Sequence, residues 1–102
     1  MEEVKLNGML DGALQFALSG DIDLGNAEEF YAEIVNGYNA TPANVVFDCS
    51  NLNFIDSTTL GTFVKILKKA KTDGKKMTLV GLQPKVKKLF VICSLDTIME
   101  IK

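Results

Sequence analysis

Histidine and arginine are absent from the sequence, and only two cysteines, Cys49 and Cys93, are present. The lack of histidine argues against the usual serine and cysteine hydrolases, a histidine phosphocarrier and the common zinc enzymes, which all depend on imidazole. The two cysteines lie far apart, without a CxxC spacing. We therefore expect both thiols to be buried as small apolar groups, and we expect no metal site, no cofactor and no catalytic residue.

Long apolar runs and a leader-like start are also missing. The longest apolar stretches, residues 45–47 and 91–92 among them, are far shorter than the roughly 20 apolar residues that a membrane span needs. Residues 1–3 lack the basic region and the following apolar run of a signal peptide. The chain has 102 residues, 47% of them hydrophobic, which is enough for one core. We expect a single domain over residues 1–102, located in the cytoplasm and not bound to a membrane.

Charge is unevenly distributed along the chain. Every lysine except Lys5 lies at or after Lys65, whereas most carboxylates precede Ser57, and the net charge is -2. A basic half could in principle bind nucleic acid, but there is no basic-aromatic interleaving and no nucleic-acid-binding motif. We therefore interpret the lysines as a solvated face and expect no direct contact with nucleic acid.

The first part of the chain predicts a hairpin followed by a helix. Residues 11–12 form an Asp-Gly pair typical of a tight turn, and apolar residues alternate over residues 14–18. Asn26 and Glu29 have the spacing of a capping box, which predicts the start of a helix. Apolar residues at helical spacing follow, and Gly37 is the first of the signals that predict the end of this helix.

The remaining chain alternates between strand and helix patterns. Residues 45–47 form a short β-branched run that predicts a strand covered on both faces and central in the sheet. A helix then carries one apolar stripe, and residues 77–80 predict a further strand in a right-handed parallel crossover. Pro84 fits the first position of a third helix, and the last residues fit a terminal strand. The inward-facing residues of the third helix are expected to be Val86, Leu89, Phe90 and Cys93.

The most informative segment is residues 53–61, in which Ser57, Thr58 and Thr59 follow Asp56 at the entry to a helix. Helix capping by Asp56 or Ser57 would contribute about 0.5 to 2 kcal/mol, and it would explain only one of these residues. It would not explain Gly61, because a helical glycine costs about 0.5 to 1 kcal/mol relative to alanine. Gly61 therefore indicates close packing or the close approach of a partner.

A hydroxyl at the start of a helix is suited to carrying phosphate, because free amides and the positive end of the helix dipole stabilise an anion. The site could accept phosphate without unfolding. About two added negative charges beside Asp56 would nevertheless change the surface that a partner meets.

Residues 54–61 resemble the phosphorylation segment of anti-sigma factor antagonists of the STAS type, usually written Asp-Ser-(Ser/Thr)-Gly-Leu-Gly. The phosphoserine of that family falls on Ser57. Residues 20–23 are similar to the family's Gly-Glu-Leu-Asp, and residues 26–29 to the start of its first helix. Further similarity covers residues 46–48, residues 79–82, Val86, Leu89 and Phe90, so the resemblance extends over nearly the whole chain.

The resemblance implies an α/β fold with a STAS-type mixed sheet of four to five strands flanked by helices, in the order β-β-α-β-α-β-α with a final strand. It implies a bacterial regulator of transcription that acts by protein binding. With Ser57 unphosphorylated, the protein would bind a serine-kinase anti-sigma factor and release the sigma factor. That kinase would phosphorylate Ser57 with ATP, and a serine phosphatase would reverse the modification. A monomer is the simplest expectation, and an uncovered sheet edge would allow a weak dimer.

Two departures from the family pattern concern the expected partner surface. Thr59 replaces a glycine, and the chain ends soon after Ile101, where many relatives continue into another helix. Thr59 could alter the fit of a kinase or pack against its own helical turn, and Thr58 is a second candidate acceptor. The partner-binding or site-supporting residues are expected to be Asp21, Asp23, Asp56, Thr58, Thr59 and Gly61. For the three aspartates the alternative roles are loop solvation, turn formation and helix capping.

Two other classes of function remain open. The domain could be a structural STAS subunit of a lipid-transport or stress-signalling complex, in which the phosphorylation segment is silent. An enzyme would need a carboxylate pair such as Asp21 with Asp23 or Asp56, and no sequence feature indicates a shifted pKa there. We therefore expect a protein-binding module and no enzymatic activity.

Overall fold

The computed structural model describes all residues from 1 to 102. The predicted order of elements is confirmed, including the final strand. The elements are β1 (Val4–Leu10), β2 (Ala13–Ile22), α1 (Ala27–Ala40), β3 (Asn44–Ile55), α2 (Ser57–Thr72), β4 (Met77–Val80), α3 (Pro84–Ile92), the short 3-10 helix η1 (Leu95–Thr97) and β5 (Glu100–Ile101). None of the helices is both long enough and apolar enough to cross a membrane.

The five strands form one mixed sheet in the order β1-β2-β3-β4-β5. β1 and β2 are antiparallel, and the other neighbouring strands are parallel. The hairpin is confirmed: Asp11 and Gly12 both have a positive φ, 53° and 80°, which a two-residue turn between twisted strands requires. β3 is the central strand, as predicted, but it is longer than expected and continues to Ile55.

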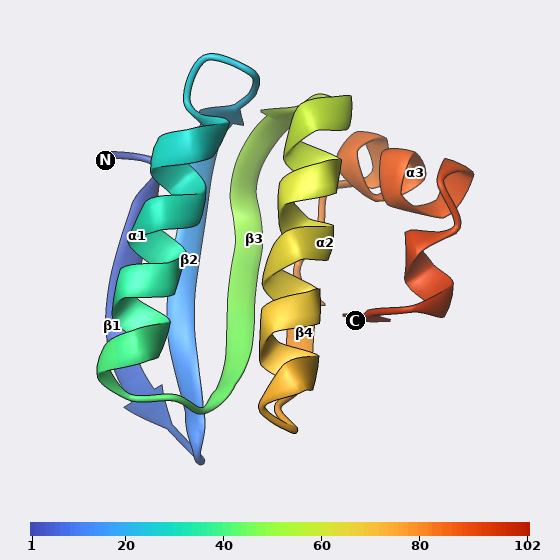
Figure 1. Ribbon diagram of the computed structural model, residues 1–102. Coiled ribbons are helices and arrows are strands. Elements are labelled where there is room, and N and C mark those ends of the chain that lie inside the picture. The colour runs from blue at the N-terminus through green and yellow to red at the C-terminus, as the bar shows by residue number, and fades with distance from the viewer.

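The helices pack on one face of the sheet, with α1 and α2 running side by side roughly along the strands and α3 beside the first turns of α2 (Figure 1). A continuous series of aromatic rings joins the two layers. Between ring centroids, Phe47 of β3 lies 5.7 Å from Phe16 of β2 and, across the two layers, 5.5 Å from Phe63 of α2. Phe63 in turn lies 5.3 Å from Phe30 of α1 and 5.4 Å from Phe90 of α3. These rings form the centre of the core.

The other face of the sheet is less covered than the sequence predicted. Along β3, Phe47 and Cys49 are fully buried, whereas Val46 is half-buried and Asp48 is exposed. The expectation that residues 45–47 are covered on both faces is therefore wrong. Short runs of this kind do not distinguish a strand buried on both faces from one that has small or polar residues on an open face.

The predicted capping box of α1 is also wrong. Asn26 does precede the helix, but its side chain makes no cap hydrogen bond. Its Oδ1 accepts a hydrogen bond from the backbone amide of Asp23 at 2.8 Å, and its Nδ2 donates to the carbonyl of Asp21 at 3.0 Å. The helix continues through Gly37, where a Cβ would lie only 3.0 Å from Cζ of Phe16. Gly37 thus permits close packing of α1 on β2, and the helix ends at Ala40, just after the stop signals at Gly37 and Asn39.

The two cysteines have different environments, which corrects the expectation for one of them. Cys49 is buried in β3, and burial together with the neighbouring Asp48 raises the pKa of its thiol to about 12. Cys93 is exposed, because α3 ends at Ile92 and Cys93 is the capping residue that follows. Leu89 is only half-buried, so the inward face of α3 is formed mainly by Val86 and Phe90.

Candidate functional site

The candidate site lies where β2 and β3 end. These strands are parallel, and Ile22 pairs with Ile55, so the loop before α1 and the start of α2 emerge side by side at the same edge of the sheet. Figure 1 shows the two helix starts at one end of the molecule. The carboxyl ends of parallel strands are a common place for functional groups, because the loops that follow them converge there. Asp23 and Ser57 follow these two strand ends.

Asp56 is the N-cap of α2 and also holds the neighbouring loop. Its Oδ1 accepts a hydrogen bond from the backbone amide of Thr59 at 3.0 Å, and its Oδ2 accepts one from the amide of Leu24 at 2.9 Å. These bonds, with that from Thr59 as the largest cause, hold the pKa of the Asp56 carboxyl below its ordinary value. The capping role considered for Asp56 is therefore observed, together with a second contact that the sequence did not predict.

Thr59 lies beneath the site and not on its surface. Its side chain is 0% exposed, and its Oγ1 contacts both the backbone carbonyl of Ile22 and Oδ1 of Asp56, the latter at 3.0 Å. A hydroxyl has one proton, so it can donate to only one of these acceptors at a time. The expectation that the departure at Thr59 concerns the partner surface is wrong. Its β-branched side chain packs inward and connects α2 to the end of β2.

Ser57 and Thr58 are the exposed hydroxyl residues of the segment. Gly61, one turn further along α2, is exposed as well, and a Cβ at this position would have no atom within 4 Å. Close packing inside the protein therefore does not explain this glycine. The alternative explanation, close approach of a partner, remains a prediction. Thr58 and Gly61 lie three residues apart and so share one side of the helix.

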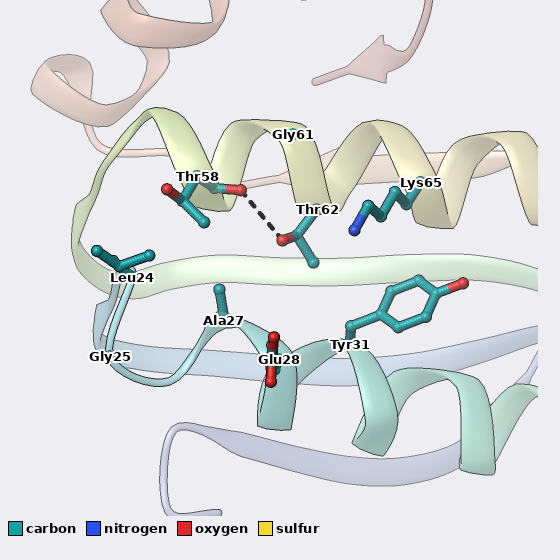
Figure 2. Close-up of a pocket in the computed structure, with 9 residues that line it drawn as sticks. All are labelled: Leu24, Gly25, Ala27, Glu28, Tyr31, Thr58, Gly61, Thr62 and Lys65. Carbon is teal, nitrogen blue, oxygen red and sulfur yellow. Dashed lines mark hydrogen bonds between the residues drawn. The ribbon is translucent and has the colours of Figure 1, made fainter.

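A groove with a volume of about 370 Å³ runs between the first halves of α1 and α2. Figure 2 shows its two walls: Leu24, Glu28 and Tyr31 belong to the loop and α1, and Thr58, Gly61 and Lys65 belong to α2. Leu24 is 75% exposed at the mouth of this groove. The Nζ of Lys65 lies 5.9 Å from the ring centroid of Tyr31, which brings the positive charge over the aromatic ring. Ser57 is not among the lining residues, whereas Thr58 is.

Asp21 and Asp23, at the end of β2 and in the loop that follows, differ in burial and in hydrogen bonding. Asp21 is exposed at the end of β2. Asp23 is half-buried, and its Oδ1 accepts a hydrogen bond from the amide of Gly25 at 2.8 Å, an arrangement that forms a turn. Asp23 thereby shapes the loop that presents Leu24. Any contact of either aspartate with a partner remains a prediction.

Leu24 is the main residue of this surface that sequence reasoning missed. The sequence did carry a signal for it: a large apolar side chain stands between Asp23 and Gly25, in a loop that shows neither the helical nor the strand pattern of apolar residues. Glu28 and Tyr31 could not be recognised in this way, since they lie on an ordinary amphipathic helix.

Comparison with known proteins agrees with the mixed sheet and its helical layer. The sequence pattern of the STAS domain matches residues 8–102. The chain therefore belongs to the STAS domain family.

Among solved structures, a candidate anti-sigma factor antagonist from Thermotoga maritima superposes with a TM-score of 0.84 and is 25% identical, with 96% of this chain and 82% of that chain covered. The anti-sigma factor antagonist SpoIIAA in its unphosphorylated form has a TM-score of 0.75 and 16% identity, over 97% of this chain and 86% of its own. A chain of the stressosome, a signal integration and transduction hub, has a TM-score of 0.65 and 20% identity, over 91% of this chain and 83% of its own. At these identities the last two show the fold alone.

Proposed function

We propose that this protein is an anti-sigma factor antagonist, a cytoplasmic protein-binding switch controlled by phosphorylation of Ser57. With Ser57 unmodified, it binds a serine-kinase anti-sigma factor and so releases the sigma factor. The observation that carries this proposal is the position of Ser57, which is exposed at the first residue of α2 directly after the capping carboxylate of Asp56. The kinase transfers a phosphoryl group from ATP to the Ser57 hydroxyl, and a serine phosphatase removes it.

The surroundings of Ser57 support a switch that acts through surface charge. The bonds that hold the site together are made by Asp56 and Thr59, so a phosphate on Ser57 does not replace any of them. Phosphorylation adds about 1.5 to 2 negative charges at neutral pH, next to a carboxylate that is already ionised. A partner surface that fits the unmodified site then meets strong like-charge repulsion or loses its fit, while the fold persists.

The groove between α1 and α2 supplies a larger contact area beside Ser57. Leu24 offers an exposed apolar side chain, and Gly61 leaves space for a close approach to α2. Contacts of this kind, one apolar anchor beside a closely approached backbone, are well suited to a protein partner. Thr58 lies in the same groove and is a second candidate phosphate acceptor.

The description of the Thermotoga maritima protein as a candidate anti-sigma factor antagonist supports the same function. SpoIIAA, which has the same fold, is described as an anti-sigma factor antagonist and has been solved in both an unphosphorylated and a phosphorylated form. The similarity to a stressosome chain favours a second candidate function, that of a structural STAS subunit in a signalling assembly without a phospho-switch.

Affinity capture from lysate of the source organism tests the two functions. The baits are the wild-type chain, Ser57→Ala, Ser57→Asp and, as a matched control that adds one negative charge on β1 away from the site, Asn7→Asp. The switch predicts that wild type, Ser57→Ala and Asn7→Asp retain an ATP-binding anti-sigma kinase, that Ser57→Asp retains much less, and that phosphate maps to Ser57. Capture of assembly subunits that is equal for all four baits, without phosphate on Ser57, would instead support the structural role.

A further inference from the structure

A second, smaller groove lies between the end of β3 and α3. Its volume is about 220 Å³, and it is lined by Asn53, Phe54, Ile55, Lys85, Val86 and Leu89. We call it the β3–α3 groove. Ile55 and Val86 are almost fully buried within it, whereas the ring of Phe54 is 50% exposed at its side. In Figure 1 α3 lies beside the first turns of α2, on the opposite side of that helix from α1. It shares no lining residue with the groove between α1 and α2.

One further exposed apolar side chain lies on the same side of α3 as the groove. Ile92, on the last turn of the helix, is 66% exposed and follows Leu89 by three residues. An exposed apolar area that is bordered by charged groups typically marks a protein interaction site, because removing the apolar area from water against a partner is favourable. Phe54 and Ile92 are two of the eight large apolar side chains that the fold leaves exposed.

The charge at this groove is positive. Lys85 lines the groove, Lys88 follows it by three residues on the same side of α3, both are exposed, and α3 contains no carboxylate. Neither lysine forms an ion pair, because the ion pairs of the protein involve the amino terminus of Met1 and the side chain of Lys102. Two neighbouring positive charges beside an apolar groove are therefore available to a partner.

Helix stability does not account for these lysines. A cation stabilises the last turn of a helix and destabilises the first, because the helix dipole is positive at its start. On α2, Lys69 and Lys71 lie in the last turn, in agreement with the dipole. On α3, Lys85 and Lys87 lie in the first turn, where the dipole opposes them and where no acidic residue is present. An anionic group from outside the protein would relieve this arrangement.

The walls of the groove are held in place before any partner binds. Gln83, which precedes α3, donates hydrogen bonds from Nε2 to the Asn53 side-chain oxygen at 3.0 Å and to the Ser50 carbonyl at 3.2 Å. Gly81 has a φ of 74°, and a Cβ there would lie 3.3 Å from Ser50, so the connection from β4 runs close against β3. A preformed groove loses less conformational entropy when it binds a ligand than a mobile one does.

We propose that the β3–α3 groove is a docking site for an acidic segment of a partner protein, one that inserts an apolar side chain beside Phe54 and places carboxylates against the lysines of α3. The apolar lining selects an anchor side chain, and the uncompensated positive charge selects its flanking residues. This docking site does not depend on phosphorylation of Ser57.

Peptide display provides the test. The full-length chain is immobilised, dodecapeptides that bind it are selected from a random library, and their affinities are measured by fluorescence anisotropy. The test variant is Lys85→Glu/Lys88→Glu, and the matched control is Lys68→Glu/Lys71→Glu, which reverses two exposed lysines on α2. Amide chemical shifts then locate the bound peptide. Glutamate early in α3 agrees with the helix dipole, so the melting temperature of the test variant should not fall.

The expected peptides combine an apolar anchor with an excess of aspartate and glutamate. They should bind the test variant at least about tenfold more weakly than wild type, while the control variant changes affinity by less than about twofold. Shifts should concentrate at residues 53–55 and 85–92. The proposal is overturned if no peptide is enriched, if the enriched peptides lack acidic residues, if both variants lose affinity equally, or if the shifts map to the groove between α1 and α2.

Discussion

The carboxylate of Asp56 accepts a hydrogen bond from the backbone amide of Leu24 at 2.9 Å, across a sequence separation of 32 residues. The same carboxylate caps α2 through Thr59. A single side chain therefore fixes both the start of the helix that carries Ser57 and the loop that presents Leu24. The stability of the site and the position of its most exposed apolar residue are coupled through Asp56.

Substitution of this carboxylate tests that coupling. Asp56→Ala should lower the free energy of unfolding at neutral pH by about 1 to 2 kcal/mol, since a cap is lost, and urea denaturation measures the change. The folded-state pKa of Asp56 is lowered, so its ionised form contributes stability that is present above the ordinary carboxyl pKa and is lost as the pH falls through the lowered value. The difference between wild type and Asp56→Ala should therefore shrink in acid. Asp21→Ala, at an exposed position, is the control, and a difference that persists unchanged in acid would contradict the role of the charge.

The buried hydroxyl of Thr59 can be tested with two substitutions of similar size. Thr59→Val keeps the shape of the side chain but removes the contact to the Ile22 carbonyl, and should cost about 1 to 3 kcal/mol of unfolding free energy. Thr59→Ser retains the hydroxyl and should cost less. Thermal unfolding followed by circular dichroism ranks the two. A larger loss for Thr59→Ser than for Thr59→Val would show that packing of the methyl group, and not the hydrogen bond, holds this position.

Two helical glycines should respond in opposite directions to alanine. Gly61→Ala places a methyl group in open space and should raise the unfolding free energy by about 0.5 to 1 kcal/mol. Gly37→Ala should destabilise the fold, because its Cβ would lie 3.0 Å from the buried ring of Phe16. If Gly61 permits close approach of the anti-sigma factor, the stabilised variant should also capture less of that partner. Stabilisation with unchanged capture would remove Gly61 from the proposed contact surface.

The cysteines should differ in reactivity toward a thiol reagent such as Ellman's. Cys93 is exposed and should react in the native protein. Cys49 is buried with its thiol pKa raised to about 12, so it should react only after unfolding in denaturant. Cys93→Ser is the control and should abolish the native reaction. Release of two thiol equivalents from the native protein would contradict the burial of Cys49.

The sequence predicted most of the fold because the relevant signals are local. The Asp-Gly turn, the four-residue strand at residues 77–80 and the position of Pro84 at the start of α3 each depend on neighbouring residues only. One error concerned a helix cap: Asn26 bonds back to Asp21 and Asp23 of its own loop in place of capping α1. Another concerned burial, because the sequence of a short apolar run does not show that one face of β3 stays partly open at Val46.

The candidate site was predicted less completely than the fold. The segment containing Asp56, Ser57 and Thr58 could be recognised from residue type and order. The inward direction of Thr59 could not, since the three consecutive hydroxyl residues look alike until the helix is placed against β2. Leu24 and the groove it borders likewise exist only because two loops meet at the end of the sheet.

The sequence by itself determined the order of the elements, the start of α2 at Ser57 and the family resemblance, because turn chemistry, hydrophobic period and motif are properties of short segments. Only the tertiary structure decided which of these residues face a partner. Parallel pairing of β2 with β3 brings residues more than thirty positions apart into contact, and this pairing buries Thr59, binds Leu24 to Asp56 and leaves Ser57 exposed.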